Sequence, residues 1–252
     1  MSIHQTLFSA YPNPLIIVDS ADFDGTNDVM TRGAALTGIE DSKTGILSLW
    51  CRIDAQDDAT RRIFSCSTVQ ACQLNLTVGN NFQLIGQNAT PTTILSLAST
   101  TAYIAGATWL HVLASWNLAV AGSGRLYITD VSDKSEVTYT DDTISYTGAT
   151  DWSIGASTAG LADFDGCLAE VYFAPGQYLD FDIIANRRKF ISVSGKPVHL
   201  GATGALPTGT APIVYQSVAN GAAVATFATN LGTGGNYSIT GTLETGSTSP
   251  SD

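Results

Sequence analysis

Positive charge is scarce in this sequence. The chain has 11 Lys and Arg residues against 22 Asp and Glu residues, so its formal net charge is −11 over 252 residues. Proteins that bind nucleic acid neutralise phosphates with many cationic side chains, and this balance argues against a nucleic-acid partner. Charged residues make up only 13% of the chain and hydrophobic residues 44%, which is typical of a packed globular protein.

Long apolar runs are also missing. No stretch approaches the ~20 apolar residues that a membrane-spanning helix needs. Residues 1–13 lack the basic region of a signal peptide, and the apolar run at residues 15–18 is short. We therefore expect no membrane insertion and synthesis in a cytoplasm.

Cysteine is sparse and forms no CxxC pair, which argues against a zinc site. The four cysteines are Cys51, Cys66, Cys72 and Cys167. The alternation of Cys51 with the leucines of residues 47–53, and of Cys167 with Val171 and Phe173, predicts that both point into the core as buried thiols. The alternative is a Cys51–Cys167 or Cys66–Cys72 disulfide formed in an oxidising medium.

Short alternating segments bounded by turns fill the chain instead, and they predict β-strands. The predicted strands cover residues 45–54, 61–66, 72–78, 82–86, 92–97, 109–116, 125–129, 152–155, 213–216 and 237–243. Residues 1–20 read as an N-terminal arm with one possible edge strand at 15–18. Residues 21–245 form one domain with a Gly/Thr-rich extension from about 195, and residues 246–252 are a tail that we expect to fray.

One short helix is predicted near residues 180–190. Asp180 and Asp182 offer a cap and negative charge at its start. Ile183 and Ile184 lie about two turns before Phe190 in one apolar stripe. The basic residues 187–189 would complement the C-terminal end of the helix dipole.

A repeated pentapeptide marks the domain. Ala-Asp-Phe-Asp-Gly occurs at residues 21–25 and again at 162–166, each time as a turn leading into a strand. The first and last core strands of a sandwich often lie side by side, so we expect the two copies to be neighbours.

Several segments carry a family resemblance. They are Phe23-Asp-Gly-Thr-Asn-Asp28, Leu47-Ser-Leu-Trp50, Trp109-x-His-Val112 with Ser115-Trp116, and Phe164-Asp-Gly-x-Leu-Ala-Glu-Val-Tyr172. In order and spacing, residues 21–192 resemble the laminin-G-like, concanavalin A-like jelly roll. The resemblance implies an all-β fold in which two antiparallel sheets form a jelly-roll sandwich.

A second resemblance rests on the later part of the chain. Glu170–Tyr178, Asn186–Ile191 and Thr208–Ile213 are similar to laminin-G-like proteins of tailed bacteriophages and prophages. This implies a virion structural protein of the head, collar or tail fibre, made in the host cytoplasm. Its partners would be other virion proteins and itself, as a homo-oligomer. The alternative is an adhesin module that binds host surface glycans.

Catalytic carboxylates are not expected. Glycosidases with this jelly roll place paired acids on one strand, and retaining chemistry needs two carboxyls ~5–5.5 Å apart. The glutamates of this chain stand apart, at Glu40, Glu136, Glu170 and Glu244. We therefore predict that the protein is not an enzyme and has no catalytic residues.

The resemblance does imply one weak metal site, because related domains bind calcium through carboxylates at the sheet rim. The candidates here are Asp22, Asp24, Asp28, Asp163 and Asp165. The favoured alternative is turn chemistry, in which these carboxylates accept backbone N–H groups. No other cofactor is expected.

Two further residue types are weighed as binding groups. His111 lies in the middle of a predicted strand without an evident Ser or Asp partner, so a structural role is favoured. The four tryptophans, Trp50, Trp109, Trp116 and Trp152, could stack on sugar rings, although strand parity favours core packing for Trp116.

Overall fold

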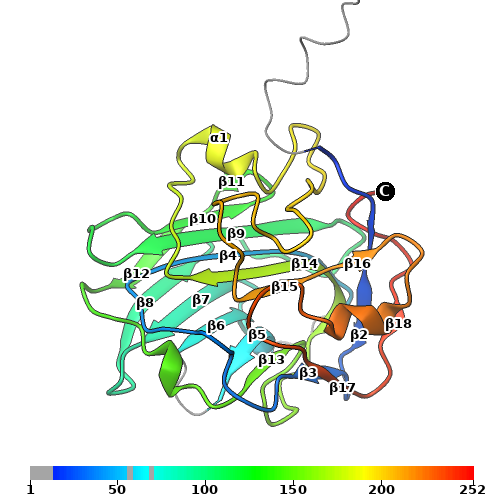
Figure 1. Cartoon of the computed structure of the whole chain (residues 1–252), viewed down its shortest axis with the longest axis horizontal. Helices are drawn as coiled ribbons and strands as arrows, with labels where there is room; N and C mark the ends of the chain where they lie inside the picture. Colours follow the sequence, from blue (N-terminus) through cyan, green and yellow to red (C-terminus); the bar gives the residue numbers. More distant parts are fainter. Residues whose placement is uncertain (1–13, 56–58, 68–70) are drawn as a thin grey trace, which may run out of the picture.

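Two antiparallel β-sheets stack face to face in the computed structural model, which describes residues 14–55, 59–67 and 71–252 (Figure 1). The strands in chain order are β1 (Val18–Asp19), β2 (Ala21–Asp24), β3 (Val29–Thr31), β4 (Thr44–Ile53), β5 (Arg61–Cys66), β6 (Cys72–Leu76), β7 (Phe82–Gln87), β8 (Thr93–Ala98), β9 (Leu110–Asn117), β10 (Arg125–Ile128), β11 (Val131–Ser132), β12 (Ser135–Tyr139), β13 (Trp152–Ile154), β14 (Asp165–Pro175), β15 (Val214–Gln216), β16 (Val218–Ala219), β17 (Ser238–Thr240) and β18 (Glu244–Thr245).

The first sheet has the order β11-β10-β9-β4-β14-β2-β18, and β15 also pairs with β14. The second sheet has the order β12-β8-β7-β6-β5-β13-β3-β17, and β1 pairs with β16 separately. This arrangement confirms the predicted all-β jelly-roll sandwich. The strands predicted over residues 45–54 and 61–66 are present as β4 and β5 with bounds shifted by at most one residue.

The two copies of the repeated pentapeptide lie side by side, as predicted. Asp24 pairs with Asp165, Phe23 with Gly166, and Ala21 with Leu168 in the antiparallel register of β2 and β14. Strand β4 occupies the other edge of β14. The two copies therefore join the first and last long segments of the sandwich.

A β-bulge interrupts β14. Between Ala169 and Tyr172 the pairing with β4 shifts by one residue, and Glu170 there has a left-handed backbone with φ 51°. A bulge inserts one residue into a strand and so changes which face the following side chains take. Leu168 faces the core before the bulge, and Val171 faces it afterwards.

Because of this bulge, the prediction that Cys167 points into the core between the sheets is wrong. Counting back from Phe173 by twos puts Cys167 in the core, but the extra residue turns it to the outer face of the first sheet. There it pairs with Arg52 and Asp22, whereas Cys51 lies among the core residues. A disulfide between Cys51 and Cys167 does not fit this geometry, since the two side chains lie on opposite faces.

The other two cysteines lie next to each other. The backbone N–H of Cys72 points to the sulfur of Cys66 at 3.4 Å, and all four cysteines are buried. A Cys66–Cys72 disulfide stays a prediction.

Phe173 of β14 lies at the centre of the core between the sheets. Its ring contacts Phe64 of β5 with 5.0 Å between centroids, Trp152 of β13 at 5.5 Å and Tyr146 at 5.7 Å. All four side chains are fully buried. Burial of each large apolar side chain stabilises the fold by roughly 1.5–3 kcal/mol, so this cluster links β14 firmly to the second sheet.

A second apolar layer covers the outer face of the first sheet. Phe181, Phe190 and Leu200 pack there against Tyr172 and Ile46, and Figure 1 shows the segment after β14 crossing this face. Because both faces of the sheet are covered, β4 is buried along almost its whole length.

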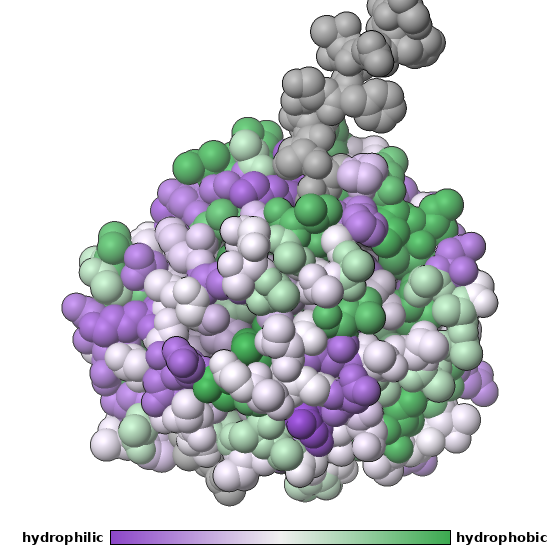
Figure 2. Space-filling model, in the orientation of Figure 1, coloured by the Kyte–Doolittle hydropathy of each residue, from purple (hydrophilic) through white to green (hydrophobic). Residues whose placement is uncertain are grey.

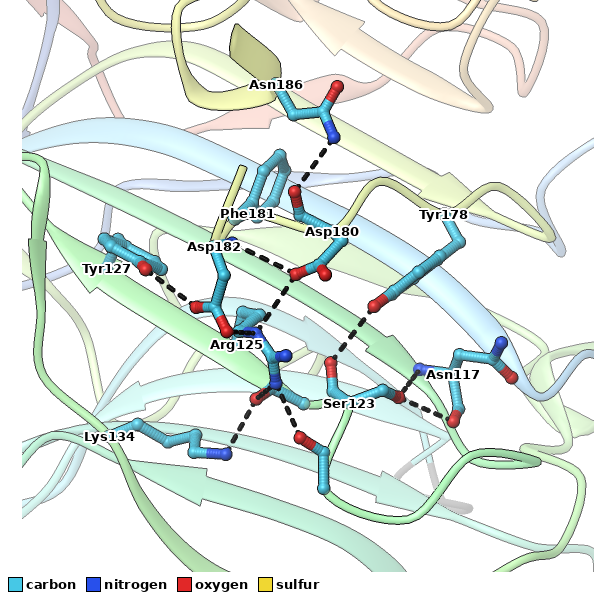
Figure 3. A network of polar contacts seen from close by, with 12 residues as sticks. Asn117, Ser123, Arg125, Tyr127, Lys134, Tyr178, Asp180, Phe181, Asp182 and Asn186 are labelled. Atoms are coloured by element: carbon cyan, nitrogen blue, oxygen red, sulfur yellow. Dashed lines mark hydrogen bonds and ion pairs between the residues drawn. The ribbon is translucent and has the colours of Figure 1, made fainter. Parts of the chain in front are cut away.

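Polar contacts fix the path of this covering segment (Figure 3). Arg125 of β10 forms ion pairs with Asp180 at 3.2 Å and Asp182 at 2.8 Å, and the Tyr127 hydroxyl donates to Asp182 at 2.9 Å. The Tyr178 hydroxyl donates to the carbonyl oxygen of Ser123. These bonds attach the start of the segment to the edge of the sheet.

The predicted helix near residues 180–190 is reduced to a single turn, α1 (Ile184–Arg187). Asp180 caps no helix, since its carboxylate accepts the backbone N–H of Asp182. Ile183 and Ile184 are more than half exposed and form no apolar stripe with Phe190. Within the described residues, no helix is long and apolar enough to cross a bilayer.

The basic cluster after α1 has a partner that the sequence did not reveal. Arg187 and Arg188 each bind Asp130 at 2.6 Å, and the Arg187 guanidinium lies 4.5 Å from the ring centre of Tyr127. The two arginines therefore pair with the β10–β11 turn and not with a helix dipole.

Gly45 is required by the close packing of β4. It pairs with Trp116 of β9, and a Cβ at position 45 would overlap the Trp116 ring. We expect Gly45→Ala to lower the free energy of unfolding by about 1–3 kcal/mol, the usual cost of overpacking. Urea denaturation measures this. Gly106→Ala, where a Cβ meets nothing within 4 Å, is the control, and equal midpoints for the two variants would contradict the packing.

Candidate binding site around Trp109

The four tryptophans have different surroundings. Trp116 and Trp152 are fully buried in the core between the sheets, as the parity of Trp116 predicts. Trp50 is 2% exposed and lies on the outer face of the first sheet. Trp109, just before β9, is only partly buried and lines a cavity of about 440 Å³. A cavity of this size falls within the range of small-molecule sites.

Five separate parts of the chain form the cavity. Besides Trp50 and Trp109, its lining residues are Ala107, Thr129, Ser194, Gly195, Lys196, Thr248, Ser249, Pro250 and Asp252. Most of the lining side chains other than the tryptophans carry a hydroxyl, an ammonium or a carboxylate. The cavity therefore combines an aromatic surface with many hydrogen-bonding groups.

The prediction that residues 246–252 fray does not agree with their contacts. Ser249 and Pro250 are buried, and the Ser251 hydroxyl accepts the backbone N–H of Val18 at 3.0 Å. The Asp252 carboxylate accepts the backbone N–H of Ser249 at 2.7 Å. These contacts hold residues 248–252 as one wall of the cavity.

A hydrogen-bonded chain orients Trp109. Its indole N–H donates to the Thr248 hydroxyl at 3.1 Å, and Arg52 donates to the same oxygen at 2.6 Å. The Arg52 guanidinium in turn binds both carboxylate oxygens of Asp54 at 2.6 Å. A bidentate pair of this kind has a defined geometry. Arg52, held by Asp54, therefore fixes the position of the Thr248 hydroxyl and, through it, that of the Trp109 indole.

His111 lies beneath Trp50, outside the cavity. The two rings stack with 4.6 Å between centroids, and Nε2 of His111 lies 2.8 Å from the Ser48 hydroxyl. Burial lowers the pKa of His111 to about 3, against a smaller opposite effect from Asp130, so the imidazole is neutral. The Ser48 partner was missed from the sequence, although the register of β4 and β9 places the two residues diagonally. Because both are buried, this pair has no access to a substrate.

Two of the five calcium candidates take part in turns. Asp24 accepts the backbone N–H groups of Thr26 and Asn27 at 2.8 and 3.1 Å. Asp28 accepts those of Asp24 and Thr242 at 3.2 and 2.7 Å. This is the turn chemistry that the sequence offers as the alternative to metal binding.

Asp22 belongs to a different group. Its carboxylate, that of Asp54 and the Cys167 thiol have ligand atoms within 4.8 Å of one another, so a possible set of metal ligands exists here. Calcium takes six to eight oxygen ligands, whereas this set includes a sulfur, and Arg52 already binds both oxygens of Asp54. The set formed by Asp22, Asp54 and Cys167 does not fit calcium. Calcium binding by the candidate aspartates stays a prediction.

Asp163 and Asp165 lie at the start of β14 near this group. Burial raises the pKa values of Asp22 and Asp165, and the negative charge of Asp54 adds to the effect at both. Burial likewise raises the pKa of Asp163. Within the described residues, Asp22, Asp163 and Asp165 do not line the cavity beside Trp109.

A family comparison matches residues 23–176, which is more than half of the chain, to the concanavalin A-like lectin/glucanases superfamily. The chain belongs to this superfamily. A search of the curated proteins found no match.

Solved structures share the superfamily fold. A protein from Bacteroides ovatus described as carbohydrate-binding aligns with a TM-score of 0.59 and 13% identity over 92% of this chain, which spans 60% of that protein. A heptameric SAP-like pentraxin from Limulus polyphemus has a TM-score of 0.47, with 15% identity over 68% of this chain and 82% of the pentraxin.

Domain 4 of an extracellular arabinanase from Geobacillus stearothermophilus, solved with arabinotriose, has a TM-score of 0.44. Its identity is 16% over 64% of this chain and 73% of the domain. Of these three matches, that to the Bacteroides ovatus protein alone has a TM-score above 0.5, and at 13% identity it shows a common fold and nothing further. None of these matches concerns a bacteriophage protein, so the virion role stays a prediction.

The neutral His111 makes the stability of this superfamily member depend on pH. The unfolded chain takes up the His111 proton near the ordinary value of about 6.5, and the folded chain only near 3. The contribution of this residue is therefore complete above about 6.5 and is lost as the pH falls towards 3.

Between about pH 6.5 and 3 we expect the free energy of unfolding of His111→Gln to fall less steeply with decreasing pH than that of the wild type. The two slopes should differ by up to about 1.4 kcal/mol per pH unit. Denaturant titrations of both proteins at several pH values measure this difference. Parallel pH curves for wild type and variant would show that His111 does not titrate in this way.

Proposed function

We propose that this domain binds a carbohydrate in the cavity beside Trp109. The observation that carries the proposal is the position of Trp109, a partly exposed indole fixed from below and surrounded by hydroxyl, ammonium and carboxylate groups. The superfamily includes lectins by its description, and the Bacteroides ovatus protein with the same fold is described as carbohydrate-binding. Both support the proposal.

The cavity has the chemistry that a sugar requires. A sugar ring has an apolar face of C–H groups, which packs on an aromatic side chain, and a rim of hydroxyls that donate and accept hydrogen bonds. Trp109 supplies the aromatic surface. Lys196 donates, Asp252 accepts, and the Thr129 and Ser194 hydroxyls do both. Because Thr248 and Arg52 already fix the indole, binding loses little side-chain entropy there.

The resemblance to laminin-G-like bacteriophage proteins suggests where such carbohydrate binding would take place. A glycan-binding module of a phage particle would recognise host surface sugars, and we keep this adhesin role as the finer form of the proposal. No observation on the described residues specifically favours a structural role in the virion.

The proposal predicts that Trp109→Ala weakens glycan binding by about tenfold or more, which corresponds to at least about 1.4 kcal/mol. A glycan array with the full chain identifies the ligand, and titration calorimetry with that ligand compares the variants. The unfolding midpoint of Trp109→Ala is measured in parallel, so that loss of fold is separated from loss of binding.

A second cavity provides the matched control. It measures about 300 Å³ and is formed by rim loops with Asp41, Asn88 and Asp142 but without an aromatic side chain. Asp142→Ala should leave the affinity unchanged. Loss of binding in Asp142→Ala with retention in Trp109→Ala would place the ligand at the rim, and an array without any bound glycan would overturn the proposal.

A further inference from the structure

A third cavity lies where the N-terminal strand meets the C-terminal segment. Its volume is about 380 Å³. Much of the wall consists of small or apolar side chains, among them Ile16, Ala202, Ala219, Ala222 and Leu231, and His199, Thr226 and Thr229 also line it. Figure 2 shows hydrophobic residues gathered on the side of the molecule where β16 and the 3₁₀ helix η3 (Val224–Ala228) lie. Trp109 is not part of this cavity.

Two lining residues connect the cavity to a buried carboxyl. The Tyr215 hydroxyl donates to Oε2 of Glu170 at 2.9 Å, and the Ser217 side chain is near enough to lower the pKa of this carboxyl. Tyr215 and Ser217 both line the cavity, whereas Glu170 is 2% exposed. The carboxyl therefore lies one residue behind the cavity wall.

The local structure of Glu170 is costly. It is the residue of the β14 bulge with the left-handed backbone, a conformation that is strained outside glycine. Its Oε1 atom has no hydrogen-bond partner in the described part of the chain, and a buried carboxylate without a partner cation is unfavourable. Strained and buried ionisable groups of this kind gather at functional sites.

The groups acting on Glu170 are neutral. Burial raises its pKa to about 7, and hydrogen bonds from Ser217 and Tyr215 lower it from a still higher value. No described cation contributes. When Glu170 is ionised, the Tyr215 proton is used towards it, so the Tyr215 oxygen has only lone pairs left to offer a ligand. The Ser217 hydroxyl beside it can accept a hydrogen bond as well.

We propose that this cavity binds a small organic cation, an amine with an apolar body, whose ammonium group lies at the Ser217 and Tyr215 end. The apolar walls hold the body of the ligand. The ammonium donates to the two hydroxyl oxygens and supplies the positive charge that the Glu170 carboxylate lacks. The site is separate from the glycan cavity, and neither proposal depends on the other.

Three probes of equal length test the ligand class on the full chain at pH 8. They are hexylamine, hexan-1-ol and hexanoate, and amide chemical-shift titration follows their binding. Hexylamine should bind about tenfold more tightly than hexanoate, with the shifts centred on residues 215–219. Equal binding of hexanoate, or no binding of hexylamine, overturns the proposal.

Variants then test the role of Glu170 as a positioning residue. Glu170→Gln should remove the preference for hexylamine over hexan-1-ol, while Glu244→Gln, a change at an exposed carboxyl on β18, should retain it. Ala219→Phe alters an exposed lining residue and should block all three probes even if Glu170→Gln fails to fold. Unchanged binding of hexylamine in Ala219→Phe would contradict the site.

Discussion

Strand β14 pairs with other strands along both edges and packs against apolar layers on both faces. The rest of the structure depends on this constraint. One edge joins β4, and the other is divided between β2 and β15. Phe173 enters the core between the sheets, while Tyr172 enters the outer apolar layer. Strand β14 must satisfy these four sets of contacts. At the bulge at Glu170 its pairing register with β4 shifts by one residue, and this shift allows all four sets to form. Without that bulge, the residues on one side of it would be turned to the opposite faces of the sheet.

Much of the sandwich could be predicted from alternation, because strands with one buried face repeat with period two. The same rule failed for Cys167, since a bulge inserts a residue that leaves no mark in the pattern of apolar residues. The helix near residues 180–190 was predicted from capping and charge, but Phe181 and Phe190 are both drawn onto the sheet. Tertiary packing outweighed helix propensity there, and Arg187 found its partner in Asp130.

The candidate site was less accessible to sequence reasoning. The sequence offered four tryptophans as sugar-stacking candidates and gave no reason to prefer Trp109, because exposure depends on which segments cover each side chain. Its wall from Thr248 to Asp252 was assigned to a frayed tail, since a short run of Ser, Thr and Pro has no apolar periodicity. The repeated pentapeptide, by contrast, predicted a long-range pairing correctly, because both copies had to enter the same sheet.

The contacts of residues 248–251 have a consequence for the time at which the binding cavity can form. Trp109 and Thr248 are separated by 139 residues, and Val18 and Ser251 by 233. During synthesis the strands up to β14 can assemble as soon as they leave the ribosome, whereas the wall beside Trp109 is still unmade. The cavity beside Trp109 is therefore complete only once residues 248–252 have reached the sandwich.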